Sequence, residues 1–136
     1  MNNISIPATS CTPEVEFDFD GRTLSLAGES YPENAAAFYR PLITALENFV
    51  PAQSQGTGSP LTLHVALSYF NSSSTKMLFS LLSAVNNAAA AGIATTLHWY
   101  YDPEDDISEE FGQELSLDFP AIAFHLHAES YHDELR

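Results

Sequence analysis

Hydrophobic and polar residues alternate along several short segments of this chain, and a period of two is typical of half-buried β-strands. The segments with this alternation are Glu14–Phe19, Thr23–Leu26, Leu61–Leu67, Thr95–Tyr101 and, after Pro120, Ala121–Leu126. Asp20-Gly21 separates the first two and is a hairpin turn signal. The pattern therefore predicts an antiparallel hairpin followed by three further strands.

Between these strands, apolar residues recur at the spacing of one buried helical face. The first predicted helix begins at Ser30 and Glu33, which are spaced like a capping box. The second helix is expected from about Ser73 to Ala91. A short third helix follows the acidic loop Asp102–Glu110 and ends near Leu117. The predicted order is thus β-β-α-β-α-β-α, with a last strand after it.

This order determines the expected fold class. Strand–helix–strand units imply parallel neighbours joined by right-handed crossovers. We expect an α/β fold in which a mixed sheet of four to five strands packs with helices. The length fits a single domain over residues 1–136. Within it, we expect residues 1–12 as a flexible lead and residues 121–136 as a variable C-terminal strand and tail.

The charge balance disfavours some classes of binding partner. The net charge is −14, and the only basic residues are Arg22, Arg40, Lys76 and Arg136. Nucleic acids and anionic membrane surfaces are therefore poor partners, because both are bound largely through Lys and Arg. No secretory signal or membrane-spanning run is evident. The single cysteine, Cys11, is consistent with a reducing compartment. We expect a cytoplasmic protein without membrane insertion.

Four consecutive hydroxyl residues, Ser72–Thr75, join the third predicted strand to the second helix. Any of them could cap the helix, because Ser and Thr side chains accept hydrogen bonds from the first N–H groups. A helix N-terminus also suits a phosphate, which would add up to two negative charges there. Lys76 is the only nearby cation. The residues alone leave both capping and regulation open.

Three runs in this order carry a resemblance to a known family: Ser30–Ala35, Leu67–Lys76 and Trp99–Asp102, with Thr12–Phe17 before them. Together they resemble the SiaC family of bacterial regulatory phosphoproteins, over roughly Cys11 to Pro120. The resemblance implies a fold like that of anti-sigma-factor antagonists (STAS-like). It also implies phosphorylation by a dedicated protein kinase and dephosphorylation by a PP2C-like phosphatase. The unphosphorylated form would bind and activate a diguanylate cyclase, raise cyclic-di-GMP and promote biofilm formation.

The resemblance also assigns the site. The family's phosphoacceptor is the threonine directly after Tyr-Phe-Asn, which falls on Ser72 here, with Ser73 and Ser74 as secondary candidates. If the strands before Ser72 and Asp102 are neighbours, the two loops share one edge of the sheet. The residues that we expect to bind partners there are Tyr69, Asn71, Ser73, Lys76, Tyr101 and Asp102. The predicted function is a non-catalytic phospho-switch. The alternative is a constitutive interaction module in which the serines only cap a helix.

Other chemistry is less well supported by the residue pattern. His125 and His127 share one face of a predicted strand, and Asp102 begins an acidic cluster, but neither has a diagnostic metal-ligand spacing. Ser72, His98 and Asp102 could form a hydrolase triad, but no Gly-x-Ser-x-Gly motif is present. We therefore expect no metal, no cofactor and no enzymatic activity.

Overall fold

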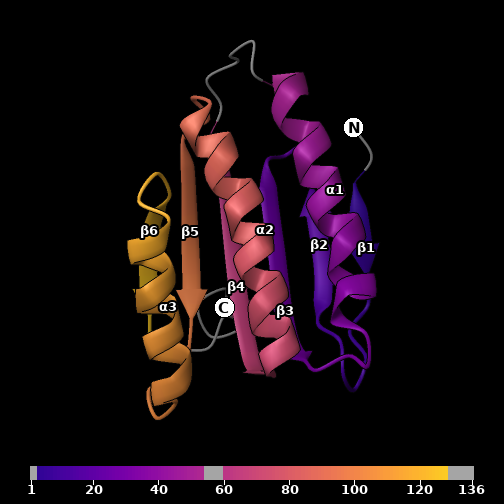
Figure 1. Cartoon of the computed structure of the whole chain (residues 1–136), viewed down its shortest axis with the longest axis vertical. Coiled ribbons are helices and arrows are strands. Elements are labelled where there is room, and N and C mark those ends of the chain that lie inside the picture. The colour runs from indigo at the N-terminus through magenta and orange to yellow at the C-terminus, as the bar shows by residue number, and fades with distance from the viewer. Residues whose placement is uncertain (1–2, 54–59, 129–136) are drawn as a thin grey trace.

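The computed structural model describes residues 3–53 and 60–128. The strands are β1 (Ile4–Ile6), β2 (Glu14–Asp18), β3 (Thr23–Ser30), β4 (Leu61–Phe70), β5 (Thr95–Tyr100) and β6 (Ala123–His127). The helices are α1 (Ala35–Gln53), α2 (Ser72–Ala90) and α3 (Asp106–Asp118). Figure 1 shows these elements in chain order.

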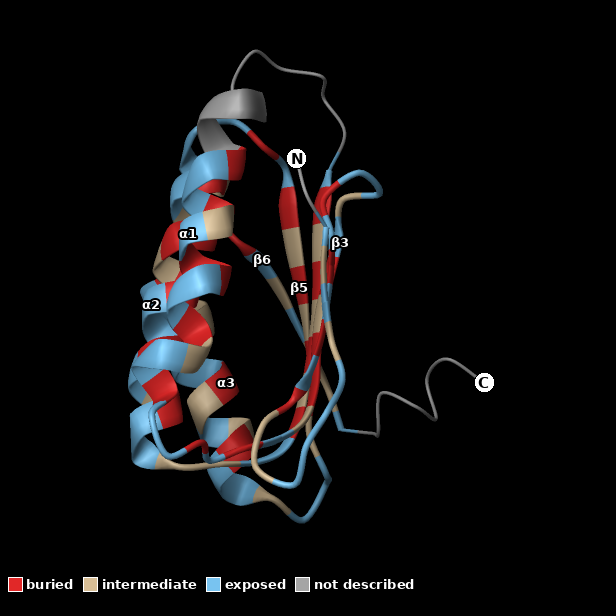
Figure 2. Ribbon diagram, turned by 90° about the vertical axis from the view of Figure 1, so that its right-hand side faces the viewer, coloured by how far each residue is buried: buried red, intermediate tan, exposed pale blue. Residues whose placement is uncertain are grey.

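The described strands form one sheet, in which strands that are consecutive in sequence are also neighbours in space. β1, β2 and β3 pair antiparallel, whereas β3, β4, β5 and β6 pair parallel. One helix connects each parallel pair. Figure 2 shows that the three helices all lie on the same face of the sheet. The molecule therefore has two layers, with helices over one face and, among the described residues, no helix over the other.

The predicted α/β class and mixed sheet are confirmed, but the sheet has six strands instead of four to five. The missed strand is β1, which pairs with β2 so that Ile4 lies opposite Phe17 and Ile6 opposite Val15. It lies in the segment 1–12 that we expected as a lead, and its three residues are too few to show a clear alternation. The expected likeness to anti-sigma-factor antagonists stays a prediction.

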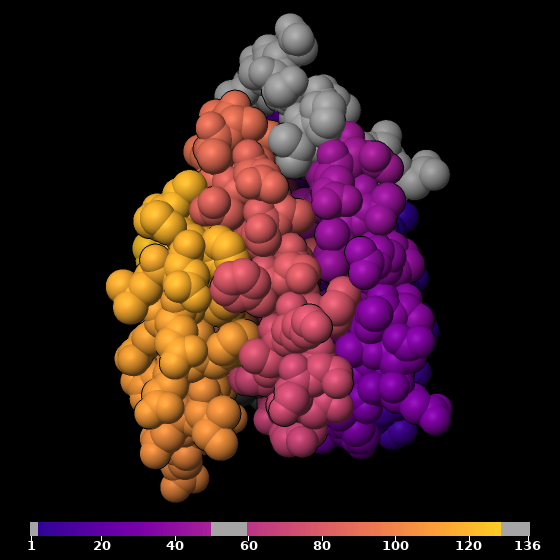
Figure 3. All heavy atoms as spheres, viewed as in Figure 1, coloured from indigo at the N-terminus to yellow at the C-terminus, as the bar shows by residue number. Residues whose placement is uncertain are grey.

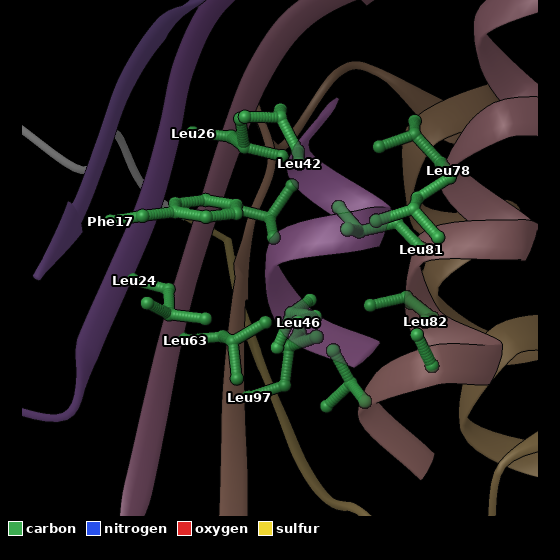
Figure 4. Close-up of a cluster of buried hydrophobic side chains, with 14 of the residues drawn as sticks. Phe17, Leu24, Leu26, Leu42, Leu46, Leu63, Leu78, Leu81, Leu82 and Leu97 are labelled. Carbon is green, nitrogen blue, oxygen red and sulfur yellow. The ribbon is translucent and has the colours of Figure 1, made fainter. Parts of the chain in front are cut away.

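The hydrophobic core lies between the sheet and the helices. Alternate strand residues such as Phe17, Leu24 and Leu63 face this layer, and Figure 4 shows them opposite the leucines of α1 and α2. Leu46 of α1 and Leu81 of α2 are fully buried in this core. Burying each such side chain stabilises the fold by roughly 1.5–3 kcal/mol relative to leaving it exposed. The core thereby fixes α2 on the sheet and so positions its first turn.

The start of α1 differs from the prediction. Ser30 is the last residue of β3, where it pairs with Phe70 of β4, and is not a helix cap. The helix begins at Ala35, and the side-chain oxygen of Asn34 accepts a hydrogen bond from the Ala37 N–H at 3.0 Å. The capping-box prediction was wrong because pairing with β4 keeps the chain extended through Ser30. That pairing brings the Ser30 hydroxyl into the interior.

Candidate functional site

The carboxyl ends of β4 and β5 place the two predicted loops at one edge of the sheet. The two strands are parallel neighbours, with Val65 opposite Trp99. α2 follows β4, and the acidic loop that begins at Asp102 follows β5. The expectation that the serine cluster and the acidic loop share an edge is confirmed, and both lie at the lower end of the view in Figure 1.

Asn71 caps α2. Its backbone is extended (φ −92°, ψ 178°), and its Oδ1 atom accepts a hydrogen bond from the Ser74 N–H at 2.9 Å. The Asn71 carbonyl oxygen accepts hydrogen bonds from the Thr75 N–H at 2.9 Å and from the Thr75 hydroxyl at 3.0 Å. Helix capping therefore does not explain the run of four hydroxyl residues, because the residue before them performs it.

Ser74 forms hydrogen bonds in the interior of the protein. Its side chain is fully buried, and its hydroxyl donates to the Ser30 carbonyl oxygen at 2.9 Å. The Ser30 hydroxyl lies 2.8 Å from the Ser74 Oγ and 2.6 Å from the Tyr39 hydroxyl. Burial raises the pKa of Tyr39 to about 12, against a smaller lowering effect of the hydrogen bond to Ser30. This network links the end of β3 to α1 and to the first turn of α2.

Ser72 and Ser73 are exposed, in contrast to Ser74. Among the described residues, neither side chain has a hydrogen-bond partner. They occupy the first two positions of α2, where backbone N–H groups have no acceptor within the helix. An anion on either hydroxyl would lie beside these donors and at the positive end of the helix dipole.

Lys76 is the nearest basic residue in sequence. It is exposed and lies four residues after Ser72, a spacing that puts both side chains on one helical face. The helix has no acidic residue in its first turn. A phosphate on Ser72 would therefore meet a cation one turn away instead of a like charge on the same helix.

Two tyrosines are exposed beside this turn. Tyr69 lies near the end of β4 and is 52% exposed, and Tyr31, just after β3, is 39% exposed. Their rings are 5.6 Å apart, edge to face. Large aromatic side chains are costly to leave in water and are enriched at the centres of protein interfaces. The pair makes this edge suitable for protein binding.

The acidic loop is ordered by its own carboxylates. Asp102 Oδ1 accepts a hydrogen bond from the Glu104 N–H at 2.8 Å, and Asp105 caps α3 by accepting one from the Ser108 N–H at 3.0 Å. The hydroxyl of Tyr101, which is half-buried, donates to Glu109 Oε2 at 3.3 Å. Partial burial and the charge of Glu109 raise the pKa of this phenol. Tyr101 and Asp102 therefore have local structural roles at the predicted edge.

The hydrolase triad is not assembled. His98 stacks between His64 of β4 and His125 of β6, at ring distances of 5.0 and 5.3 Å. Because its neighbours Leu97 and Trp99 are buried in the core under the helices, the alternation of β5 places His98 on the other face of the sheet. Ser72 begins a helix on the opposite face. Within the described part of the chain, no group of three or more His, Cys, Asp or Glu residues is arranged to hold a metal ion. In the same residues, no helix is long and apolar enough to span a membrane.

Sequence reasoning missed two features. One is the buried Ser30–Tyr39–Ser74 network, which joins residues up to 44 positions apart. The other is the histidine cluster, in which His98 Nδ1 lies 2.9 Å from His127 Nε2. The matching alternation of the strands contained the signal for the cluster, because His64, His98 and His125 lie directly opposite one another once the sheet order is known. His132 lies outside the described residues.

These features define a small two-layer α/β protein that presents two accessible hydroxyls at a helix N-terminus. The model of the SiaC family of regulatory phosphoproteins matches residues 6–129. A Pseudomonas aeruginosa protein described as uncharacterized is 34% identical over 129 residues, which are 92% of this chain and 98% of that protein. The chain belongs to the SiaC family of regulatory phosphoproteins.

Solved structures give the same assignment. The crystal structure of apo-SiaC from Pseudomonas aeruginosa matches 94% of this chain and all of that chain, with a TM-score of 0.84 and 30% identity. The SiaC chain in the crystal structure of the diguanylate cyclase SiaD with its activator SiaC matches with a TM-score of 0.78 and 32% identity. That match covers 91% of this chain and 99% of the other. The SiaC of that structure is thus an activator bound to a diguanylate cyclase.

Proposed function

We propose that this chain is a non-catalytic, cytoplasmic phospho-switch. A protein kinase phosphorylates Ser72, a PP2C-like phosphatase removes the phosphate, and the unphosphorylated form binds and activates a diguanylate cyclase. The observation that carries the proposal is that adjacent hydroxyls differ in exposure and in hydrogen bonding. Ser72 is exposed at the start of α2, while the hydroxyls of Ser74 and Thr75 bond to backbone carbonyl oxygens.

The position explains how a phosphate acts without unfolding the protein. The Asn71 cap and the buried Ser74 hydrogen bonds hold the first turn independently of the Ser72 side chain. A phosphate there gains the free N–H groups of the turn and the charge of Lys76. The fold therefore persists while the exposed edge changes charge. Partner binding is the property that this change alters.

The neighbouring residues support a docking surface at the same edge. Tyr69 offers an exposed aromatic ring, and Ser73 and Lys76 are exposed on the first two turns of α2. We assign these three to partner contact. The other predicted contact residues support this surface. Asn71 holds the helix start in place, and Tyr101 and Asp102 hold the acidic loop in place.

Burial argues against Ser74 as the phosphorylation site. A kinase must bring a hydroxyl into its own active site, and Ser74 is fully buried with its hydroxyl bonded to Ser30. Ser73 is exposed like Ser72 and remains the second candidate. The position directly after Tyr-Phe-Asn favours Ser72, by its correspondence with the family's acceptor.

Two variants test the switch, with binding to the host's purified diguanylate cyclases measured by calorimetry. Ser72→Ala cannot be phosphorylated and is expected to bind one of them as tightly as the unphosphorylated protein. Ser72→Asp places a negative charge at the same position and is expected to bind about tenfold or more weakly. Circular dichroism should show both variants folded. Equal binding by both folded variants would favour the constitutive module instead.

A further inference from the structure

The outer face of α2 is unusual for a solvent-exposed helix in so acidic a protein. The chain contains 18 Asp and Glu residues, yet the 19 residues of α2 contain none, whereas the 13 residues of α3 contain five. Along the outer side of α2, residues recur at steps of three or four, with Phe79 and Ser80 adjacent at the middle step, and form one stripe. This α2 stripe consists of the exposed residues Ser72, Lys76, Phe79, Ser80 and Asn87 and the half-buried Ser83.

Phe79 is the large apolar residue of the stripe. It is 44% exposed, and its ring lies 4.9 Å from the ring of Phe119, which is buried where α3 ends. A ring supported from behind keeps its position at little entropic cost when a partner covers it. Figure 3 shows the α2 band open to solvent between α1 and α3 on the helix side of the molecule.

The stripe is continuous with the proposed phosphorylation site. Phe79 lies seven residues after Ser72, which is about 10 Å along a helix axis. Lys76 lies between them and carries the only charge on α2. A phosphate on Ser72 would compete for Lys76 and would repel an acidic group placed there within about one Debye length.

We propose that the output partner of the switch, the diguanylate cyclase, packs along the α2 stripe. An apolar side chain of the cyclase covers Phe79, and a carboxylate of the cyclase pairs with Lys76. Because α2 contains no acidic residue, an acidic partner group placed on it meets no like charge from this helix. This inference rests on the proposed function and adds to it the surface and the chemistry that the cyclase recognises.

The test uses the full-length unphosphorylated protein and the purified cyclase that it binds. Phe79→Ala is expected to weaken binding about tenfold or more, the effect of losing an aromatic anchor. Lys76→Glu is expected to weaken it also, with a loss that shrinks at high salt. Leu117→Ala is the matched control, because Leu117 is a large apolar residue that is 81% exposed on α3. It should bind like the wild type.

The other outcomes distinguish this inference from the proposed function. Suppose that the wild type binds and Ser72→Asp does not, but Phe79→Ala binds normally. The cyclase then does not bind the α2 stripe, and the proposed phospho-switch is unaffected. Binding along the α2 stripe is also contradicted if Phe79→Ala and Leu117→Ala weaken cyclase binding equally. If Phe79→Ala lowers only the rate of phosphorylation by the kinase, the α2 stripe binds the kinase instead of the cyclase, and the inference is overturned. If the wild type binds no cyclase, the proposed function itself fails.

Discussion

At the scale of single residues, three neighbouring serines have different roles although their side chains are identical. Ser72 and Ser73 are exposed, whereas Ser74 is buried and bonded to Ser30. The sequence shows only a run of hydroxyls, because their exposure depends on which face of α2 packs on the sheet. The buried partner of Ser74 comes from a strand 44 residues away, and no local pattern contains that information.

The first prediction concerns the site of phosphorylation. In protein purified from its native host, mass spectrometry is expected to find the phosphate on Ser72. No phosphate is expected on Ser74, because its hydroxyl is inaccessible while α2 is packed. Phosphate found only on Ser74, in a protein that remains folded, would contradict the assignment.

The second prediction concerns Tyr39 and pH. Its pKa is raised to about 12 in the folded protein, against an ordinary value of 10.0. The folded state therefore favours the neutral phenol, and its contribution is complete below pH 10. As the pH rises from 10 through 12, the unfolded state ionises first and stability falls, by about 2–3 kcal/mol for this residue.

Chemical denaturation at pH 9 and pH 12 measures this effect, with Tyr39→Phe as the control. The variant lacks the ionising hydroxyl, so its free energy of unfolding should fall less over this range than that of the wild type. All other titratable groups are the same in both proteins, so the comparison isolates the effect of the Tyr39 hydroxyl. Parallel losses in the two proteins would show that Tyr39 does not titrate abnormally.

At the scale of secondary-structure elements, the hydrophobic pattern predicted β2 to β6 and the three helices to within a few residues, except for the strand extension at Ser30. It failed where tertiary pairing overrides a local signal. Ser30 resembles a capping residue but continues β3 as far as Phe70 of β4. β1 is stable only as a partner of β2, since three residues cannot form a strand alone.

The third prediction separates capping from regulation at the start of α2. Asn71→Ala removes the side chain that accepts from the Ser74 N–H and should lower the free energy of unfolding by about 1 kcal/mol. Ser72→Ala removes an exposed hydroxyl and should change it by less than about 0.5 kcal/mol. Urea denaturation compares the two variants. The capping interpretation predicts the reverse order.

At the scale of the whole molecule, the two-layer arrangement gives the sheet and the helices different surfaces. The helix side carries the exposed start of α2 and the α2 stripe. The other face of the sheet carries the histidine cluster of β4, β5 and β6, because the residues on either side of His98 point into the core. The sequence could predict the edge at which the site lies, because the carboxyl ends of adjacent parallel strands meet there. It could not predict the histidine cluster, because that depends on the order and register of three strands.

The central claim is that a phosphate on Ser72 controls binding of a diguanylate cyclase. The most direct test is calorimetric titration of the purified cyclase with two forms of this protein, one with phosphoserine incorporated at position 72 and the same protein after phosphatase treatment. The account predicts that the dephosphorylated form binds and that the phosphorylated form binds at least about tenfold more weakly. Equal affinity of the two forms would contradict it.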